Sequence, residues 1–145
     1  MQRQPVRTGL PFASRPSHSR RAAAACAMGK LTTHVLDTAH GRPAAGMQLS
    51  LLRLAADGTA TPLKSLRLDA DGRAGAPLLE GQALQRGRYR LVFGVADYFR
   101  ACGLVLPEPP FLDTVPVEFG VADPGAHYHV PLLVSPWSCA TYRGS

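Results

Sequence analysis

Short apolar runs separated by turn residues are the main pattern along this chain. From Gly29 onward, Gly, Pro and Asp-Gly pairs interrupt the apolar positions about every eight to twelve residues, the spacing expected of an antiparallel β-sandwich. The clearest run is 88–95, where Tyr89, Leu91 and Phe93 alternate with other residues and so share one face of a strand. The pattern predicts an all-β fold.

The same pattern divides the chain into about seven or eight strands. Tyr98 and Phe99 are expected to pack one short helix over 97–103, before the proline-rich break at 107–110. The predicted strands are 31–37, 47–54, 61–68, 76–79, 88–95, 113–119, 127–134 and a last one from 137 to the C-terminus.

The first 27 residues differ from the rest of the chain. They contain five arginines, no acidic residue and no sustained hydrophobic period, which is typical of a presequence or a disordered extension. We therefore assign 1–27 to an Arg-rich N-terminal extension or presequence, and 28–145 to one folded domain. If Met28 is the true start, we expect a cytoplasmic protein. If 1–27 is a targeting segment, the peroxisome, another organelle or the periplasm is expected instead.

The net charge of +6 is concentrated in that N-terminal segment. Residues 28–145 hold the other eleven Lys and Arg against ten Asp and Glu, a balance of only +1. A nucleic-acid-binding domain would carry its basic excess on the folded part. Apolar stretches such as 130–134 are also far shorter than the ~20 residues of a transmembrane helix. Neither nucleic-acid binding nor a membrane span is expected.

The cysteines do not form a recognisable site. Cys26, Cys102 and Cys139 are odd in number, far apart in the chain and without a Cys-x-x-Cys pair. A disulfide framework or a cysteine-based zinc site is therefore not expected. We predict that Cys102 and Cys139 are packing residues.

Three histidines are candidates for chemistry. His127 and His129 flank Tyr128 in one predicted strand, so their side chains share a face roughly 7 Å apart. At that spacing they could converge on one ligand or one metal ion, or serve only as structural polar residues. His34 lies in the middle of the first strand, on the face opposite Val35, where it either meets a ligand or partner or faces solvent.

Arg73 and the C-terminal residues are further candidates. Arg73 follows the Asp71-Gly72 turn, which would project a guanidinium from the start of a strand. Its planar fork suits an anionic ligand, although a surface arginine fits the spacing too. The last residues, including Tyr142 and Ser145, are rich in hydrogen-bonding groups and could line a polar pocket rather than fray.

Five segments of the chain belong together: Leu-Thr-Thr-His-Val-Leu-Asp at 31–37, Asp-Gly-Arg at 71–73, Tyr-Phe at 98–99, His-Tyr-His-Val-Pro-Leu-Leu at 127–133 and Tyr-Arg-Gly-Ser at 142–145. With these segments, the chain resembles the transthyretin-related 5-hydroxyisourate hydrolase family. The similarity covers 29–145. Transthyretin, the hormone carrier with the same fold, lacks the second histidine of the His-Tyr-His segment and the Tyr-Arg-Gly-Ser ending, so the resemblance favours the enzyme branch. Trp137 and Cys139 depart from the family, which usually has tyrosine in this stretch.

The resemblance implies a transthyretin-like antiparallel β-sandwich assembled as a homotetramer, with active sites in the channel where dimers meet. It implies hydrolysis of 5-hydroxyisourate to 2-oxo-4-hydroxy-4-carboxy-5-ureidoimidazoline in urate degradation, with no metal and no organic cofactor. His34, Arg73 and His129 match the family's catalytic residues. His34, Arg73, Tyr142 and Ser145 would bind the substrate. Either His34 or His129 would activate water, and His127 would have a supporting or structural role.

Two other functions are consistent with parts of the sequence. One is a transthyretin-like carrier that holds an aromatic small molecule in a tetramer channel. Such a channel should be mostly apolar. Burying two histidines and an arginine against an apolar ligand would cost several kcal/mol, because these groups would lose their hydration without gaining polar partners. The other is a metal site formed by His34, His127 and His129, which would lack a paired carboxylate or cysteine.

Overall fold

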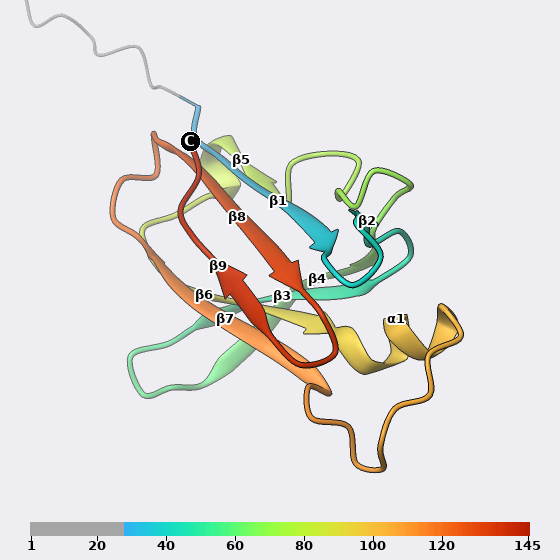
Figure 1. Ribbon diagram of the computed structural model, residues 1–145. Helices are drawn as coiled ribbons and strands as arrows, with labels where there is room; N and C mark the ends of the chain where they lie inside the picture. Colours follow the sequence, from blue (N-terminus) through green and yellow to red (C-terminus); the bar gives the residue numbers. More distant parts are fainter. Residues whose placement is uncertain (1–27) are drawn as a thin grey trace, which may run out of the picture.

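Two β-sheets packed face to face, with one helix at an end of the sandwich, form the fold (Figure 1). The computed structural model describes residues 28–145. One sheet has the strand order β2-β1-β8-β9, with β5 also paired to β1, and the other has the order β4-β3-β6-β7. The predicted all-β sandwich with one short helix is confirmed. The extension assigned to 1–27 lies outside the described residues.

Most predicted strands are present, with small shifts at their ends. The predicted strand 76–79 is only a two-residue pairing at the end of that segment, and the helix begins and ends two residues earlier than 97–103. The two-residue strand β2 and a 3-10 turn over Gly81–Ala83 had no pattern of their own. The elements are β1 (Lys30–Asp37), β2 (Arg42–Pro43), β3 (Gln48–Leu54), β4 (Ala60–Arg67), β5 (Leu79–Glu80), β6 (Gly87–Gly94), α1 (Val95–Ala101), β7 (Thr114–Val121), β8 (His127–Val134) and β9 (Cys139–Thr141).

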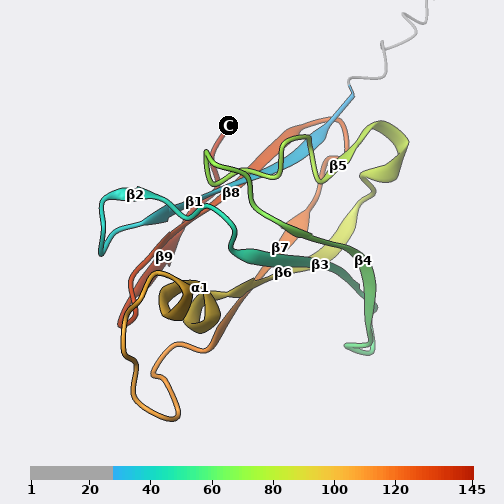
Figure 2. The ribbon, with the colours of Figure 1, turned by 90° about the vertical axis from the view of Figure 1, so that its right-hand side faces the viewer.

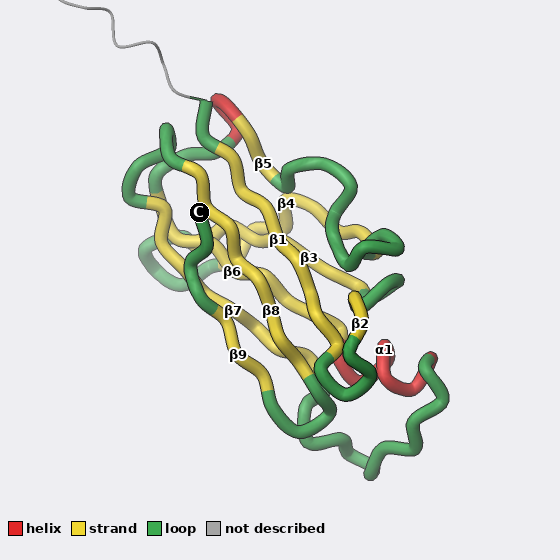
Figure 3. The backbone as a smooth tube through the Cα atoms, turned by 45° about the horizontal axis from the view of Figure 1, so that its top comes forward, coloured by secondary structure: helices red, strands yellow, loops and turns green. Residues whose placement is uncertain are grey.

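One strand pair departs from the predicted antiparallel arrangement. β1 and β8 run parallel over their whole length, from Lys30 opposite His127 to Asp37 opposite Val134. Parallel neighbours cannot be joined by a tight turn, and here most of the chain lies between them. Figure 3 shows β1 and β8 side by side in the same sheet. This pair forms the centre of the sheet that carries the candidate site.

Alternation along the strands separates a core face from an outer face. In β1, Leu31 and Val35 are fully buried, whereas Thr32 and His34 are only half-buried on the opposite face. Figure 2 shows the two layers, and these inward side chains belong to the core cluster between them. As predicted, the alternating aromatic and leucine positions of β6 point into this core. The largest fully buried side chains include Tyr89, Phe93, Phe99, Leu31, Met47 and Leu91.

The predicted packing role of the cysteines holds for one of the two described. Cys102 is partly buried against the core, next to α1. Cys139 is exposed, because it lies in the edge strand β9, none of whose residues is buried. The prediction was therefore wrong for Cys139. Within residues 28–145, no helix has the length and apolar character needed to cross a membrane.

A buried carboxylate ties the end of β1 to the helix. Asp37 is fully buried, and its Oδ2 accepts hydrogen bonds from the Tyr98 hydroxyl at 2.8 Å and from His40 Nδ1 at 2.6 Å. Its Oδ1 accepts the backbone N–H groups of Ala39 and His40. Burial alone raises the pKa of Asp37, but these hydrogen bonds outweigh it and lower the pKa below its ordinary 3.8. His40 is thus at the surface but held by a specific contact.

Replacing Asp37 by asparagine is expected to destabilise the domain by about 2 kcal/mol, since charge-assisted hydrogen bonds become neutral ones in a buried site. Because the folded pKa is lowered, the carboxylate stabilises the fold above pH 3.8, and this contribution is lost as the pH falls through the folded value. Urea unfolding near neutral pH and well below pH 3.8 should therefore show a difference between wild type and variant that shrinks in acid. A constant difference would contradict this account.

Candidate active site

The outer face of the β1–β8 pair carries a row of polar side chains. Thr32 and His34 project from β1, and His127 and His129 project from β8, because residues two apart in a strand share a face. The register places Thr32 directly opposite His129. The two sequence segments that were singled out separately thus form one surface.

Thr32 connects the two histidines of β8. Its Oγ1 lies 3.0 Å from His127 Nε2 and 2.9 Å from His129 Nδ1. Sequence reasoning did not select Thr32, although one signal was available: it stands two residues before His34 and so lies on the same face of the strand. With its Nδ1 engaged by Thr32, His129 has Nε2 left to act on a ligand.

Arg73 reaches this face from the loop between β4 and β5. Its backbone forms an isolated bridge with His34, and the N–H of Val35 donates to the carbonyl of Gly72 at 2.9 Å. Gly72 has a φ of 71°, and a Cβ there would lie 2.5 Å from the Val35 carbonyl oxygen, so only glycine fits. The Asp69 carboxylate fixes the turn by accepting the Arg73 N–H at 3.0 Å. This turn therefore positions the Arg73 side chain beside the β1–β8 pair.

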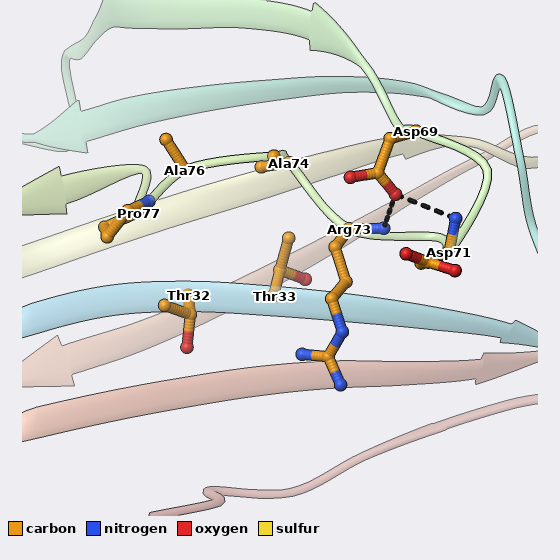
Figure 4. Close-up of a pocket in the computed structure, with 9 residues that line it drawn as sticks. Thr32, Thr33, Asp69, Asp71, Arg73, Ala74, Ala76 and Pro77 are labelled. Atoms are coloured by element: carbon orange, nitrogen blue, oxygen red, sulfur yellow. Dashed lines mark hydrogen bonds between the residues drawn. The ribbon is translucent and has the colours of Figure 1, made fainter.

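A cavity of about 330 Å³ lies beside Arg73. Figure 4 shows the Arg73 side chain extending from its loop across β1. The wall nearest the strand consists of Thr32 and Thr33, so the cavity touches the hydroxyl-bearing residue that binds both β8 histidines. The remaining lining residues are Asp69, Asp71, Ala74, Gly75, Ala76 and Pro77.

The pKa of His129 is lowered from its ordinary value of 6.5. The largest cause is burial, which disfavours the charged imidazolium, and electrostatic interactions with Arg73, His127 and His34 act in the same direction. The imidazole is therefore neutral at physiological pH. A neutral imidazole near a cationic guanidinium can accept a proton from water while the guanidinium binds an anionic or carbonyl oxygen.

The C-terminal tail closes on His129. The N–H of Gly144 donates to the His129 carbonyl at 2.7 Å, and a Cβ on Gly144 would lie 2.8 Å from His129 Cδ2. Figures 1 and 3 both place the end of the chain beside the start of β8. One residue earlier, the Arg143 guanidinium lies 4.4 Å above the centre of the Tyr128 ring, a cation–π contact. The tail is thus anchored against β8 rather than frayed.

Replacing Gly144 by alanine is expected to displace His129, so a reaction that depends on this imidazole should slow roughly tenfold, since a misplacement of about 1 Å typically costs one or two orders of magnitude in rate. The added methyl must displace either the imidazole of His129 or the tail. Steady-state kinetics with an unchanged melting temperature would support this effect. Gly120→Ala is the matched control, because a Cβ at that position meets no atom within 4 Å.

The structure brings three of the five sequence-predicted residues together. His34 and Arg73 are bridged, and both act on the pKa of His129. Ser145 directly follows the residue bridged to His129. Tyr142 is 60% exposed and lines a different cavity, between the edges of β7 and β9.

A metal site formed by the strand histidines is not supported. In the part of the chain that the structure describes, one group of three His, Cys, Asp or Glu side chains has all its ligand atoms within 4.8 Å of one another. That group is Asp37, His40 and Cys102, at the opposite end of β1 from Thr32. His34, His127 and His129 do not form such a group.

Comparisons with known proteins identify the family of this chain. The HIUase/Transthyretin family matches residues 31–144. The chain is 59% identical to the 5-hydroxyisourate hydrolase of Ralstonia nicotianae over 118 residues, which is 81% of this chain and 100% of that protein. It is 51% identical to the 5-hydroxyisourate hydrolase of Pseudomonas aeruginosa over 119 residues, covering 81% and 93% of the two chains.

Solved structures show the same relationship. The 5-hydroxyisourate hydrolase of Klebsiella pneumoniae superimposes with a TM-score of 0.67 at 31% identity, covering 81% of this chain and 99% of the other. Sea bream transthyretin in complex with thyroxine has a TM-score of 0.71 at 29% identity, with coverages of 79% and 94%. An (S)-allantoin synthase structure has a TM-score of 0.77 at 46% identity, and this chain spans 44% of its length. The chain belongs to the HIUase/Transthyretin family.

Proposed function

We propose that this protein is a hydrolase that opens the six-membered ring of 5-hydroxyisourate, giving 2-oxo-4-hydroxy-4-carboxy-5-ureidoimidazoline in urate degradation. The observation that carries the proposal is a neutral imidazole, His129, held beside Arg73 and His34 on the outer face of the β1–β8 pair. Relatives of 51% and 59% identity carry the name of this enzyme and are covered almost completely. The reaction is hydrolysis of a cyclic amide C–N bond.

His129 is proposed to be the base that activates water. Its Nδ1 is engaged by Thr32, which directs Nε2 toward the ligand. Its lowered pKa keeps the imidazole unprotonated at neutral pH, as a base requires. The attacking water gives one proton to Nε2 while its oxygen adds to the ring carbonyl. His34 is then proposed to bind the substrate from the neighbouring strand.

Arg73 is proposed to bind the carbonyl or anionic edge of the substrate. When water adds, negative charge develops on the carbonyl oxygen, and a guanidinium already in place stabilises that charge. The tail is proposed to orient the ring. Ser145 follows the Gly144 bridge to His129, whereas Tyr142 lies in the cavity between β7 and β9, so Ser145 is the better placed of the two within one subunit.

Two observations disfavour the carrier alternative. The candidate site combines histidines and an arginine, which an aromatic apolar ligand would leave without polar partners. The relatives of highest identity described above carry the name of the hydrolase, whereas the similarity to the thyroxine-bound transthyretin is 29%. The fold is shared by both groups, so the fold alone does not separate them.

A homotetramer is proposed as the working assembly. The candidate residues lie on an outer sheet face of one subunit, with His127 and Arg73 exposed. A small substrate needs walls on several sides, and a second copy of the chain facing this sheet would provide them.

The cytoplasm is the proposed compartment, on the view that Met28 is the start.

The decay of freshly generated 5-hydroxyisourate, followed by absorbance, tests the proposed function. The full chain should accelerate the decay in proportion to protein concentration, and sedimentation of the same sample should report four copies. Folded, tetrameric protein that leaves the decay rate unchanged would contradict the hydrolase and favour the carrier. Binding of an aromatic ligand such as thyroxine would then be measured on that sample.

The pKa of His129 can be measured directly by NMR titration of the ligand-free protein. We expect a value below 6.5, since burial and the electrostatic influence of Arg73 disfavour the imidazolium. The pH dependence of kcat/KM should show activity falling as the pH drops through this value, because the protonated imidazole cannot accept a proton. Arg73→Met should move the pKa of His129 upward. An unchanged pKa in that variant would place Arg73 too far from the ring to act on it.

A further inference from the structure

The hydroxyl of Thr32 lies between two imidazole nitrogens. It is 2.9 Å from His129 Nδ1 and 3.0 Å from His127 Nε2, so both contacts are hydrogen bonds. A hydroxyl has one proton, so it donates to one ring and accepts from the other. The tautomers of His127 and His129 are therefore coupled through this hydroxyl. When Thr32 accepts the Nδ1 proton of His129 and donates to His127, Nε2 of His129 carries a lone pair and can act as a base.

The surroundings of the two rings differ, and the difference favours proton transfer from His129 toward His127. His129 is half-buried and shares its site with Arg73 and His34, whereas His127 is exposed. A positive charge is therefore better hydrated on His127 than on His129. Three further charged groups lie close by: Lys30 is the exposed register partner of His127, the Asp69 carboxylate is bound to its own turn, and Arg143 lies over Tyr128.

We propose that Thr32 is a positioning residue that relays protons between His129 and His127 during the hydrolysis. The proposal rests on the proposed function and adds a proton-transfer role for Thr32 and His127. His127 is the outer end of the relay, where the proton taken from water is held next to solvent. The hydroxyl also fixes His129 in the tautomer that exposes Nε2.

The proton steps balance as follows. The attacking water breaks one O–H bond and gives its proton to His129 Nε2, which makes His129 an imidazolium. The Nδ1 proton of His129 moves to the Thr32 oxygen as the Thr32 proton moves to His127 Nε2, so the charge passes to His127. When the ring C–N bond breaks, the two transfers reverse and the Nε2 proton of His129 goes to the leaving nitrogen. The water proton ends on the product and both imidazoles are neutral again.

Three variants test the relay. Thr32→Val removes the hydroxyl with nearly the same shape, Thr32→Ser keeps it, and Thr38→Val is the matched control. Thr38 follows β1, and its hydroxyl donates to the Val134 carbonyl at 3.1 Å. The Thr38→Val variant therefore loses a hydroxyl whose hydrogen-bond partner is not a histidine. The tautomer of His129 is read from ¹⁵N chemical shifts without substrate. The kcat, the KM and the pH profile of kcat are then measured for hydroxyisourate.

We expect Thr32→Val to lower kcat roughly 10- to 100-fold with KM changed less than about threefold, and Thr32→Ser to restore most of the loss. His129 should be the Nδ1–H tautomer in wild type and a mixture of tautomers in Thr32→Val. The acid limb of kcat should also shift in that variant. Thr38→Val should leave all of these unchanged.

Two outcomes would overturn the relay. A Thr32→Val protein with wild-type kcat and an unchanged tautomer would show that the hydroxyl is dispensable. A reduced kcat with an unchanged tautomer and pH profile would assign Thr32 to packing alone. Failure of the proposed function is distinct from both: wild type itself would then be inactive, while the ¹⁵N spectra would still report whether Thr32 fixes the ring.

Discussion

Replacing His129 by glutamine is expected to lower kcat by about 100- to 10,000-fold, the usual contribution of a general base. The side chain keeps its approximate size and a polar end, but it no longer accepts a proton at neutral pH. KM should change much less, since Arg73 and His34 remain in place to bind the substrate. Stopped-flow decay of 5-hydroxyisourate measures both constants.

The comparison with His34→Gln makes this test specific. If His129 is the base, the loss in His34→Gln should appear mainly in KM, and the acid limb of the pH profile should persist. His40→Gln is a control for the loss of any imidazole, because His40 binds Asp37 at the far end of β1 from Thr32. A larger loss of kcat in His34→Gln than in His129→Gln would exchange the two roles.

Replacing Arg73 by methionine is expected to cost about 3 kcal/mol of transition-state stabilisation, or roughly 100-fold in kcat/KM. Methionine keeps the unbranched stem and removes the charge that would stabilise the developing oxyanion. Arg73→Lys should recover little, since an ammonium group does not reproduce the planar fork. The measurement is kcat/KM at a pH well above the pKa of His129, so that the base is unprotonated in every variant.

Arg88→Met is the matched control for the loss of a guanidinium. Arg88 lies on the other sheet and pairs with Glu118 at 3.1 Å, with 59% of its side chain exposed. Exposed ion pairs contribute little to stability, so this variant should keep both its fold and its activity. Equal activity of Arg73→Met and Arg88→Met would remove Arg73 from the proposed mechanism.

Local patterns in the sequence were sufficient to predict the longer strands and to select candidate site residues, to which the family resemblance then gave roles. The alternation of apolar positions identified β1, β3, β6 and β8, because each strand buries one face and the pattern records that face. The same alternation placed His127 and His129 together on the outer face. Arg73 was found from its turn, whose glycine adopts the positive φ that such a turn requires.

These local patterns did not predict contacts between segments that are distant in sequence. The direction of β8 relative to β1 is set by the path of the whole chain, so the parallel pair was not predicted. The role of Thr32 depends on the register that places it opposite His129, which no single strand reveals. The hydrogen-bonding groups of the C-terminal tail and the family resemblance, rather than any periodicity, pointed to the tail, and the bridge of Gly144 to His129 supplies a physical reason.

The parallel pairing of β1 with β8 also governs when the candidate site can appear during folding. Thr32 and His129 are 97 residues apart in sequence, so their contact closes nearly the longest loop that the described chain allows. Contacts of such high sequence separation form slowly and late, because the entropy of loop closure must be offset before they are stabilised. The hairpin β3–β4 and the antiparallel pair β6–β7, whose strands are joined by α1 and a loop, connect segments closer in sequence and can form earlier. A partly folded chain would therefore have formed much of the β4-β3-β6-β7 sheet while β1 and the histidines of β8 were still far apart. The appearance of activity would then mark the completion of folding.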